Sequence, residues 1–294
     1  MAAIMSKVWL QEQCKKYKQY HSPHLNDKLY LQNQGFSAIE NLEEYTEVKI
    51  AYLECNCIES LTGLQHMTKL RTLVAHKNNI KKIEHLNDLK MLDSIDLSDN
   101  ALAKLENLSC CPKLTSLNVA NNHLKTNESI HHLKECNNIR VLDLSHNKLE
   151  DGEYVLEVLK TLPFLSCLYL SGNPCVRSIS NYRRTLISML PGLKHLDHSP
   201  VFWTEQIYAN AWANGGDEAV ELAREEVSKT IKEMERTQFE GMRMLQAQAV
   251  KERLVPIDAT LLQFDENELI ASSVTPNTTT NCEQPLGLEN NVHI

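Results

Sequence analysis

The stretch Ile95-Asp96-Leu97-Ser98-Asp99-Asn100-Ala101-Leu102 decides the fold of this 294-residue chain. Its asparagine has apolar residues five and three positions before it and another two positions after it, and Leu142-Asp143-Leu144-Ser145-His146-Asn147-Lys148-Leu149 repeats the arrangement. Asparagines mark six repeats, first in steps of 22 residues and then in steps of 25 and 26: Asn56, Asn78, Asn100, Asn122, Asn147 and Asn173. A period of this size predicts a solenoid, in which each coil packs only on its neighbours.

The pattern is the leucine-rich repeat signature, and it predicts a right-handed α/β solenoid of the short 22-residue class. Each Leu-x-Leu segment predicts a short strand, and successive strands stack in a parallel sheet. The asparagine carries both a donor and an acceptor, so one per coil can satisfy the buried backbone groups of the turn and form a ladder. Apolar residues at every third position, such as Ile83, Leu86 and Leu89, predict a tight 3₁₀-like return on the convex side, and the longer fifth and sixth repeats have room for a helical turn.

The chain divides into five expected segments. Residues 1–26 hold an N-terminal capping helix over Ser6 to Tyr20, residues 27–172 hold the repeats, and residues 173–200 form a C-terminal cap. A helical extension follows at 201–254, and an acidic, disordered tail at 255–294, which from residue 256 on has six acids and no Lys or Arg. The residues expected to pack in the C-terminal cap are Tyr182, Arg183, Leu193, Leu196 and Asp197. For Tyr182 and Arg183 a catalytic role is the alternative, and packing is favoured over it.

Within the extension we expect a short helix over Thr204 to Asn214, a break at Gly215-Gly216 and a long helix over 217–254. The long helix has an apolar stripe in which Val220, Ile231 and Met242 are eleven residues apart. An eleven-residue repeat predicts a nearly straight or slightly right-handed helix. The stripe either packs on the solenoid of the same chain or contacts a partner helix, and the length of the helix favours a partner.

Composition excludes several classes of function. The net charge of −8 speaks against nucleic acid as the main partner, and no run of 18 apolar residues indicates membrane insertion. The nine cysteines are odd in number and scattered, which indicates buried reduced thiols in a reducing compartment rather than disulfides or a metal site. No Ser/Cys-His arrangement supports a hydrolase. We therefore expect no enzymatic activity, no metal and no cofactor.

The side chains that point out of the concave sheet are the candidate binding residues, because they alternate with the buried leucines. Tyrosines lie near both ends of this face, and two aspartates make its middle acidic. Exposed tyrosine is enriched in protein interfaces, so the face predicts a protein partner with a basic central contact. The residues expected to bind are Tyr30, Tyr52, Glu54, His76, Asp96, Asn118, Asp143 and Tyr169.

Several segments, which include positions outside the repeats at both caps, carry a family resemblance. They comprise residues 25–31, residues 35–46, Leu53-Glu54-Cys55-Asn56, residues 141–149, Asn181-Tyr182-Arg183-Arg184-Thr185, Pro200-Val201-Phe202 and residues 211–216. Together they closely resemble the leucine-rich repeat family of axonemal dynein assembly factors over residues 10 to 250. Cys57 departs from the family pattern, which commonly has glycine after this asparagine.

The resemblance implies a non-enzymatic cytoplasmic scaffold that helps preassemble dynein arms before they enter cilia or flagella. The implied partners are axonemal dynein chains, other assembly factors and chaperones, and the implied locations are the cytoplasm of ciliated cells and the cilium. An alternative is a regulatory subunit of type-one protein phosphatase, because a related short-repeat solenoid binds that enzyme through its concave face. The linear docking motif of such subunits is absent, and its nearest match is Lys49-Ile50-Ala51-Tyr52.

Overall fold

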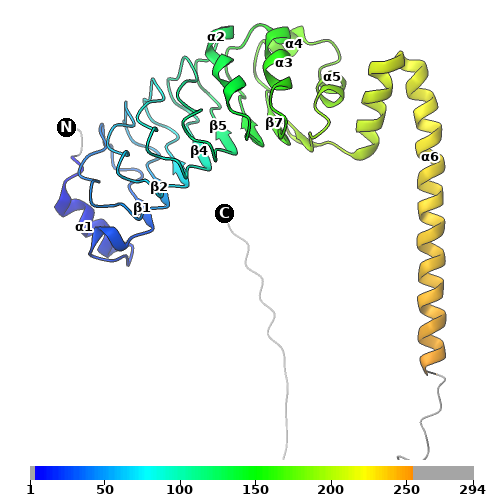
Figure 1. Cartoon of the computed structure of the whole chain (residues 1–294), viewed down its shortest axis with the longest axis horizontal. Coiled ribbons are helices and arrows are strands. Elements are labelled where there is room, and N and C mark those ends of the chain that lie inside the picture. Colours follow the sequence, from blue (N-terminus) through cyan, green and yellow to red (C-terminus); the bar gives the residue numbers. More distant parts are fainter. Residues whose placement is uncertain (1–3, 254–294) are drawn as a thin grey trace, which may run out of the picture. The chain divides into compact units, whose positions relative to one another are not determined.

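The computed structural model describes residues 4–253, and it confirms a leucine-rich repeat solenoid. Seven three-residue strands run parallel and in chain order, with a short antiparallel hairpin at the end of the sheet. The strands are β1 (Lys28–Tyr30), β2 (Ile50–Tyr52), β3 (Thr72–Val74), β4 (Ser94–Asp96), β5 (Ser116–Asn118), β6 (Val141–Asp143), β7 (Cys167–Tyr169), β8 (His195–Leu196) and β9 (Ser199–Pro200). Figure 1 shows the strands side by side along the inner side of an arc, with helices of the later coils on the opposite side.

The convex side changes its structure along the solenoid. In the 22-residue coils, the predicted 3₁₀-like return consists of separate turns with i→i+3 hydrogen bonds, as from Met67 N to Leu64 O (2.9 Å) and from Leu70 N to Met67 O (2.9 Å). The two longer coils carry helices, as their length predicts. These helices are α2 (Asn127–Ile130) with the adjoining 3₁₀ helix η2 (His131–Glu135), and α3 (Gly152–Lys160).

The six repeat asparagines are buried, and each bonds to backbone groups of its own coil and of the preceding coil. Asn78 Nδ2 donates to Leu53 O in the preceding coil (3.0 Å) and to Ala75 O in its own coil (3.1 Å). Its Oδ1 accepts from Ile58 N (3.0 Å). Gln34, one step before Asn56, has no such role, because its own backbone N–H donates to Asn56 Oδ1 (3.1 Å).

Each coil also turns through left-handed backbone conformations at fixed positions. One column lies directly before the ladder residue of each coil, with positive φ at Asn33, Cys55, Lys77, Asp99, Asn121, His146 and Gly172. A second column lies near the start of the return in four coils: Asn41, Gly63, His85 and Asn107. Gly63 has the largest φ, +108°, and a Cβ there would lie 2.4 Å from Ile39 O, so both the conformation and the close approach require glycine.

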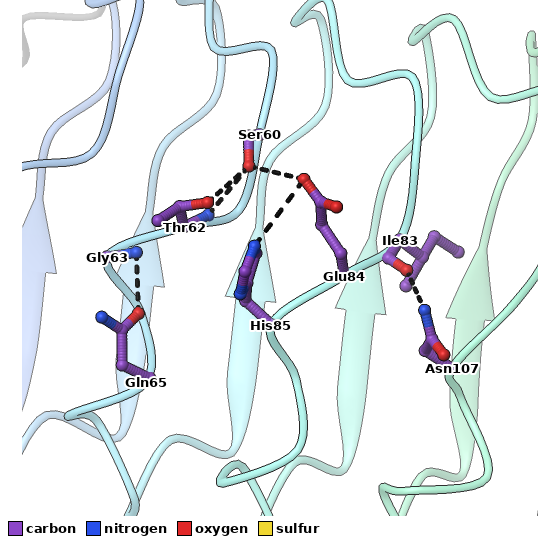
Figure 2. A network of polar contacts seen from close by, with 8 residues as sticks. All are labelled: Ser60, Thr62, Gly63, Gln65, Ile83, Glu84, His85 and Asn107. Atoms are coloured by element: carbon purple, nitrogen blue, oxygen red, sulfur yellow. Dashed lines mark hydrogen bonds and ion pairs between the residues drawn. The ribbon is translucent and has the colours of Figure 1, made fainter.

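Polar contacts tie neighbouring coils together at the second column (Figure 2). Ser60 Oγ donates to Glu84 Oε1 in the next coil (2.8 Å). Asn107 Nδ2 donates to Ile83 O (2.7 Å), again between coils. These bonds satisfy turn groups at the edge of the solenoid, as the asparagine ladder does nearer the sheet.

Helices cover both ends of the solenoid. At the N-terminal end, α1 (Lys7–Lys16) is shorter than the predicted Ser6–Tyr20 helix, because Ser6 caps its start and the backbone leaves the helix at Tyr17, before left-handed Lys18. It buries Leu10 and Cys14, whereas Val8 is exposed, and the 3₁₀ helix η1 (Pro23–Leu25) follows. At the other end lie α4 (Cys175–Ser178) and α5 (Tyr182–Met189), and α6 (Trp203–Arg253) follows them in the chain.

The asparagine ladder yields a direct stability test. Asn78→Ala should lower the free energy of unfolding by about 1–3 kcal/mol, because it leaves buried backbone groups in two coils without partners. The adjacent Asn79 is exposed and serves as a matched control, for which Asn79→Ala should change stability by less than about 0.5 kcal/mol. Urea denaturation of both variants measures the difference. Equal losses would show that the ladder contributes nothing specific to stability.

Candidate functional site: the strand face

The strand face consists of the side chains that flank the buried middle residue of each strand. Parallel pairing places equivalent residues side by side, as in Tyr30 with Tyr52 and Asn118 with Asp143. The third residues of the strands form a central column: Tyr30, Tyr52, Val74, Asp96, Asn118, Asp143 and Tyr169. Glu54 and His76, two residues further along their coils, lie in a neighbouring column. All eight predicted binding residues are half-buried on this one face.

The N-terminal end of the strand face carries a stack of three tyrosines. The ring centroids of Tyr30 and Tyr52 are 5.1 Å apart, with the planes tilted by only 4°. Tyr17 extends the stack from the end of α1, with its ring 4.6 Å from that of Tyr30. Lys16 Nζ lies 5.5 Å from the centre of the Tyr17 ring. The stack is therefore an aromatic surface that already accepts a cation at one end.

The middle of the face carries two carboxylates that are held by local donors. Oδ1 of Asp96 accepts from the backbone N–H of Ser98 (2.9 Å) and from its hydroxyl (2.7 Å). Asp143 accepts from Ser145 in the same way (2.9 and 2.6 Å). These bonds fix the orientation of both carboxylates, and within residues 4–253 the second oxygen of each receives no hydrogen bond. The sequence pattern located the charges but not the serines that hold them.

The carboxylate of Glu54, unlike those of Asp96 and Asp143, is not held by local donors. Its Oε2 is buried without a hydrogen-bond donor, and the same holds for Oε1 of Gln32. No other residue of the described chain forms an ion pair with the Glu54 carboxylate. At the far end of the face, Tyr169 lies 5.7 Å from the His195 ring, and a hydrogen bond with Cys167 raises the pKa of its hydroxyl.

The predicted cap residues form one polar and apolar cluster behind the last coil. Leu193 and Leu196 are buried. The Tyr182 hydroxyl donates to Asp197 Oδ2 (2.9 Å), and burial of the ring raises its pKa well above the usual value. Asp197 Oδ1 accepts from the backbone N–H groups of Leu170 and Ser171 in the preceding coil (2.8 and 2.9 Å). One carboxylate therefore joins the Tyr182 hydroxyl to the backbone of the last full coil.

Arg183 connects this cluster to the segment that follows. Its guanidinium forms a bidentate ion pair with Glu205 and donates to Pro200 O (2.8 Å). Glu205 lies 22 residues further along the chain, in the first turn of α6, and nothing in the sequence pattern indicated the pairing. The bidentate geometry accounts for arginine rather than lysine at position 183.

The helical extension turns where the two glycines lie. Gly215 and Gly216 have non-helical φ and ψ inside α6. Val220, Ala223 and Val227 are buried, and Arg224 lies over the Tyr208 ring at 5.9 Å, so the segment after the turn packs on the segment before it. Further along α6, the predicted apolar stripe is exposed at Ile231, Met234, Met242 and Leu245. The tail expected at 255–294 lies outside the described residues.

The histidines and cysteines of residues 4–253 do not gather into a metal site. In the described part of the chain, no three His, Cys, Asp or Glu side chains gather closely enough to hold a metal ion. The eight cysteines of that part are all free, and burial raises the pKa of Cys111 and Cys136 to about 12. Within residues 4–253 no helix has the length and apolar character needed to span a bilayer.

Comparison with known proteins yields consistent matches. A family model described as "Leucine-rich repeat" matches residues 86–227. "Leucine-rich repeat-containing protein ODA7" of Chlamydomonas reinhardtii is 54% identical over 253 residues, which are 86% of this chain and 58% of the algal protein. "Dynein axonemal assembly factor 1" of Homo sapiens is 55% identical over 245 residues, 83% of this chain and 34% of the human protein. Neither relative is named as a phosphatase subunit.

Among solved structures, an internalin from Listeria monocytogenes has a TM-score of 0.51 at 24% identity, over 59% of this chain and 48% of the internalin. At that identity the likeness supports the fold alone. The chain spans about 58% of the algal relative and about a third of the human one.

Proposed function

We propose that this chain, which is 54% identical to the algal ODA7 protein and 55% identical to human dynein axonemal assembly factor 1 over most of its length, is a scaffold for assembly of axonemal dynein arms. It acts without enzymatic chemistry, in the cytoplasm of ciliated cells, before the arms enter the cilium. Its partners are axonemal dynein chains, other assembly factors and chaperones. The observation that carries the proposal is the 54% identity over 253 residues, a match longer than the repeat region itself.

The strand face is the proposed binding surface. It presents side chains from seven parallel strands in fixed register, so one partner can contact many coils at once. The partner-binding residues on it are those predicted from the sequence: Tyr30, Tyr52, Glu54, His76, Asp96, Asn118, Asp143 and Tyr169. Asp96 and Asp143 offer carboxylates already oriented by Ser98 and Ser145, which lowers the cost of ordering them on binding.

Loss of the protein in a ciliated organism should leave cilia or flagella that are built but lack dynein arms and are immotile. The double variant Asp96→Lys with Asp143→Lys should fail to restore arms, because a basic partner contact would meet like charge. Asp96→Asn with Asp143→Asn retains an acceptor for the serine N–H groups and tests the charge alone. A charge-matched control, Glu43→Lys with Asp88→Lys, alters exposed residues outside the strands and should restore the arms.

Electron microscopy of axonemes counts the arms, and circular dichroism checks that each variant is folded. A full complement of arms in the null would refute the assembly role. Folded Asp96→Lys, Asp143→Lys protein that restores normal arms would refute the binding role of the acidic middle while leaving the assembly role intact. Co-purification with a type-one phosphatase instead of dynein chains would favour the phosphatase alternative.

A further inference from the structure

Two acceptor oxygens lie side by side near the N-terminal end of the strand face without any donor. The backbone bonds from Leu31 N to Tyr52 O (2.8 Å) and from Asn33 N to Glu54 O (3.0 Å) place Gln32 beside Glu54 in adjacent coils. Neighbouring parallel strands are about 4.8 Å apart, so the two side chains are neighbours. Glu54 Oε2 and Gln32 Oε1 are both buried and unpartnered. A native structure rarely leaves such groups unpaired, so this pair requires a donor.

The contrast with the other carboxylates of the central face is informative. Asp96 and Asp143 each have a serine two residues later that supplies two hydrogen bonds. Position 56, two residues after Glu54, is instead Asn56, whose amide bonds only backbone groups. Among the described residues, the fold therefore provides hydrogen-bond donors for Asp96 and Asp143 but none for the Glu54 carboxylate.

The aromatic surface lies directly beside this carboxylate. Tyr52 precedes Glu54 by two residues, so both side chains leave the same face of the coil. One face of its ring stacks on Tyr30, and its register partner on the other side, Val74, has no ring to continue the stack. Tyr52 thus ends the stack with an aromatic face that is not covered by another ring. A π-face next to an unpaired carboxylate is suited to a cation.

We propose that Tyr52 and Glu54, with Gln32, bind an arginine side chain of a partner polypeptide. The guanidinium packs on the part of the Tyr52 ring that extends beyond the shorter Val74 side chain, and it donates to Glu54 and Gln32. Its planar shape and its fork of N–H donors satisfy both a ring face and two acceptors, which a lysine ammonium cannot do at once. The inference rests on the proposed function in taking the partner of the strand face to be a protein. The basic group of the partner then lies two coils before Asp96, nearer the N-terminal cap.

The cation does not come from the tail of this chain. Residues 256–294 contain no Lys or Arg, so that segment has no guanidinium to offer. A polypeptide partner with an exposed arginine is therefore the occupant to test. A second copy of the chain is the other possible source of arginine, and the oligomeric state separates it from a different protein.

N-acetyl-arginine amide is a suitable probe, and the neutral isostere N-acetyl-citrulline amide is its control. Titration of the full chain, followed by the NMR shifts of the tyrosine ring protons, should show saturable binding of the arginine probe and none of the citrulline probe. Glu54→Gln should weaken binding of the arginine probe about tenfold or more, because it removes the charge from the pair. Tyr52→Leu should weaken it as well. Glu43→Gln, outside the strands, should leave the affinity unchanged.

Equal affinities of the wild-type and folded Glu54→Gln proteins would overturn the proposal, as would equal binding of arginine and citrulline. Light scattering that shows a dimer dependent on Glu54 would assign the arginine to a second copy and would also overturn the partner assignment. Probe binding is measured on the purified protein, so it does not depend on the assembly role. Saturable arginine binding by a protein whose loss leaves dynein arms intact would refute the proposed function alone.

Discussion

Leu97→Ala is expected to lower the free energy of unfolding by about 2–5 kcal/mol, because it leaves a cavity in a core that the coils share. Leu97 is fully buried directly after β4, and its backbone N–H bonds to Asn118 O in the next coil (2.8 Å). Each coil is stabilised only through its neighbours, so a cavity in a central coil weakens two interfaces. Leu144→Ala, at the equivalent position of a later coil, should cost a similar amount.

Leu222 provides the matched control. It is a leucine in the helical extension with 65% of its surface exposed, so Leu222→Ala should change stability by less than about 0.5 kcal/mol. Denaturant midpoints and slopes of the three variants give the comparison. Unchanged midpoints for Leu97→Ala and Leu144→Ala would show that the assigned inward positions of the strands are wrong.

The repeat region could be predicted because every coil has the same buried backbone groups that need hydrogen-bond partners. One buried turn per coil needs a donor and an acceptor, and asparagine supplies both, so the spacing of Asn56 to Asn173 indicated the register of all seven parallel strands. The break at Gly215-Gly216 was visible for a similar reason, since two adjacent glycines disfavour a helix.

Other features could not be predicted, because they depend on residues of varied type. The left-handed position before each ladder residue is occupied by Asn, Cys, Lys, Asp, His or Gly, so no residue type marks it. The pairing of Arg183 with Glu205 joins two segments through a turn whose geometry only the tertiary structure determines. For the candidate site, the alternation of strand residues located the face. It could not show that Asp96 is held by Ser98 while Glu54 has no donor.

Alkaline pH should destabilise the solenoid steeply, because several thiols are buried in its core. Burial raises the pKa of Cys111 and Cys136 from 9.0 to about 12, and that of Cys175 to about 11. A thiol with a raised pKa in the folded state keeps its proton there after the unfolded chain has lost it. Its contribution to stability is therefore complete below pH 9 and is lost as the pH rises toward the folded-state value.

Each of these thiols should make the free energy of unfolding fall by about 1.4 kcal/mol per pH unit above pH 9. Chemical denaturation under reducing conditions at pH 8, 9, 10 and 11 measures the slope. Cys136→Val removes one titrating group from the core and should reduce the slope by about that amount, whatever it does to stability at pH 8. Cys57→Ser alters an exposed thiol and should leave the slope unchanged. A slope that Cys136→Val does not reduce would mean that the Cys136 thiol is not protected from ionisation by the packing of the coils.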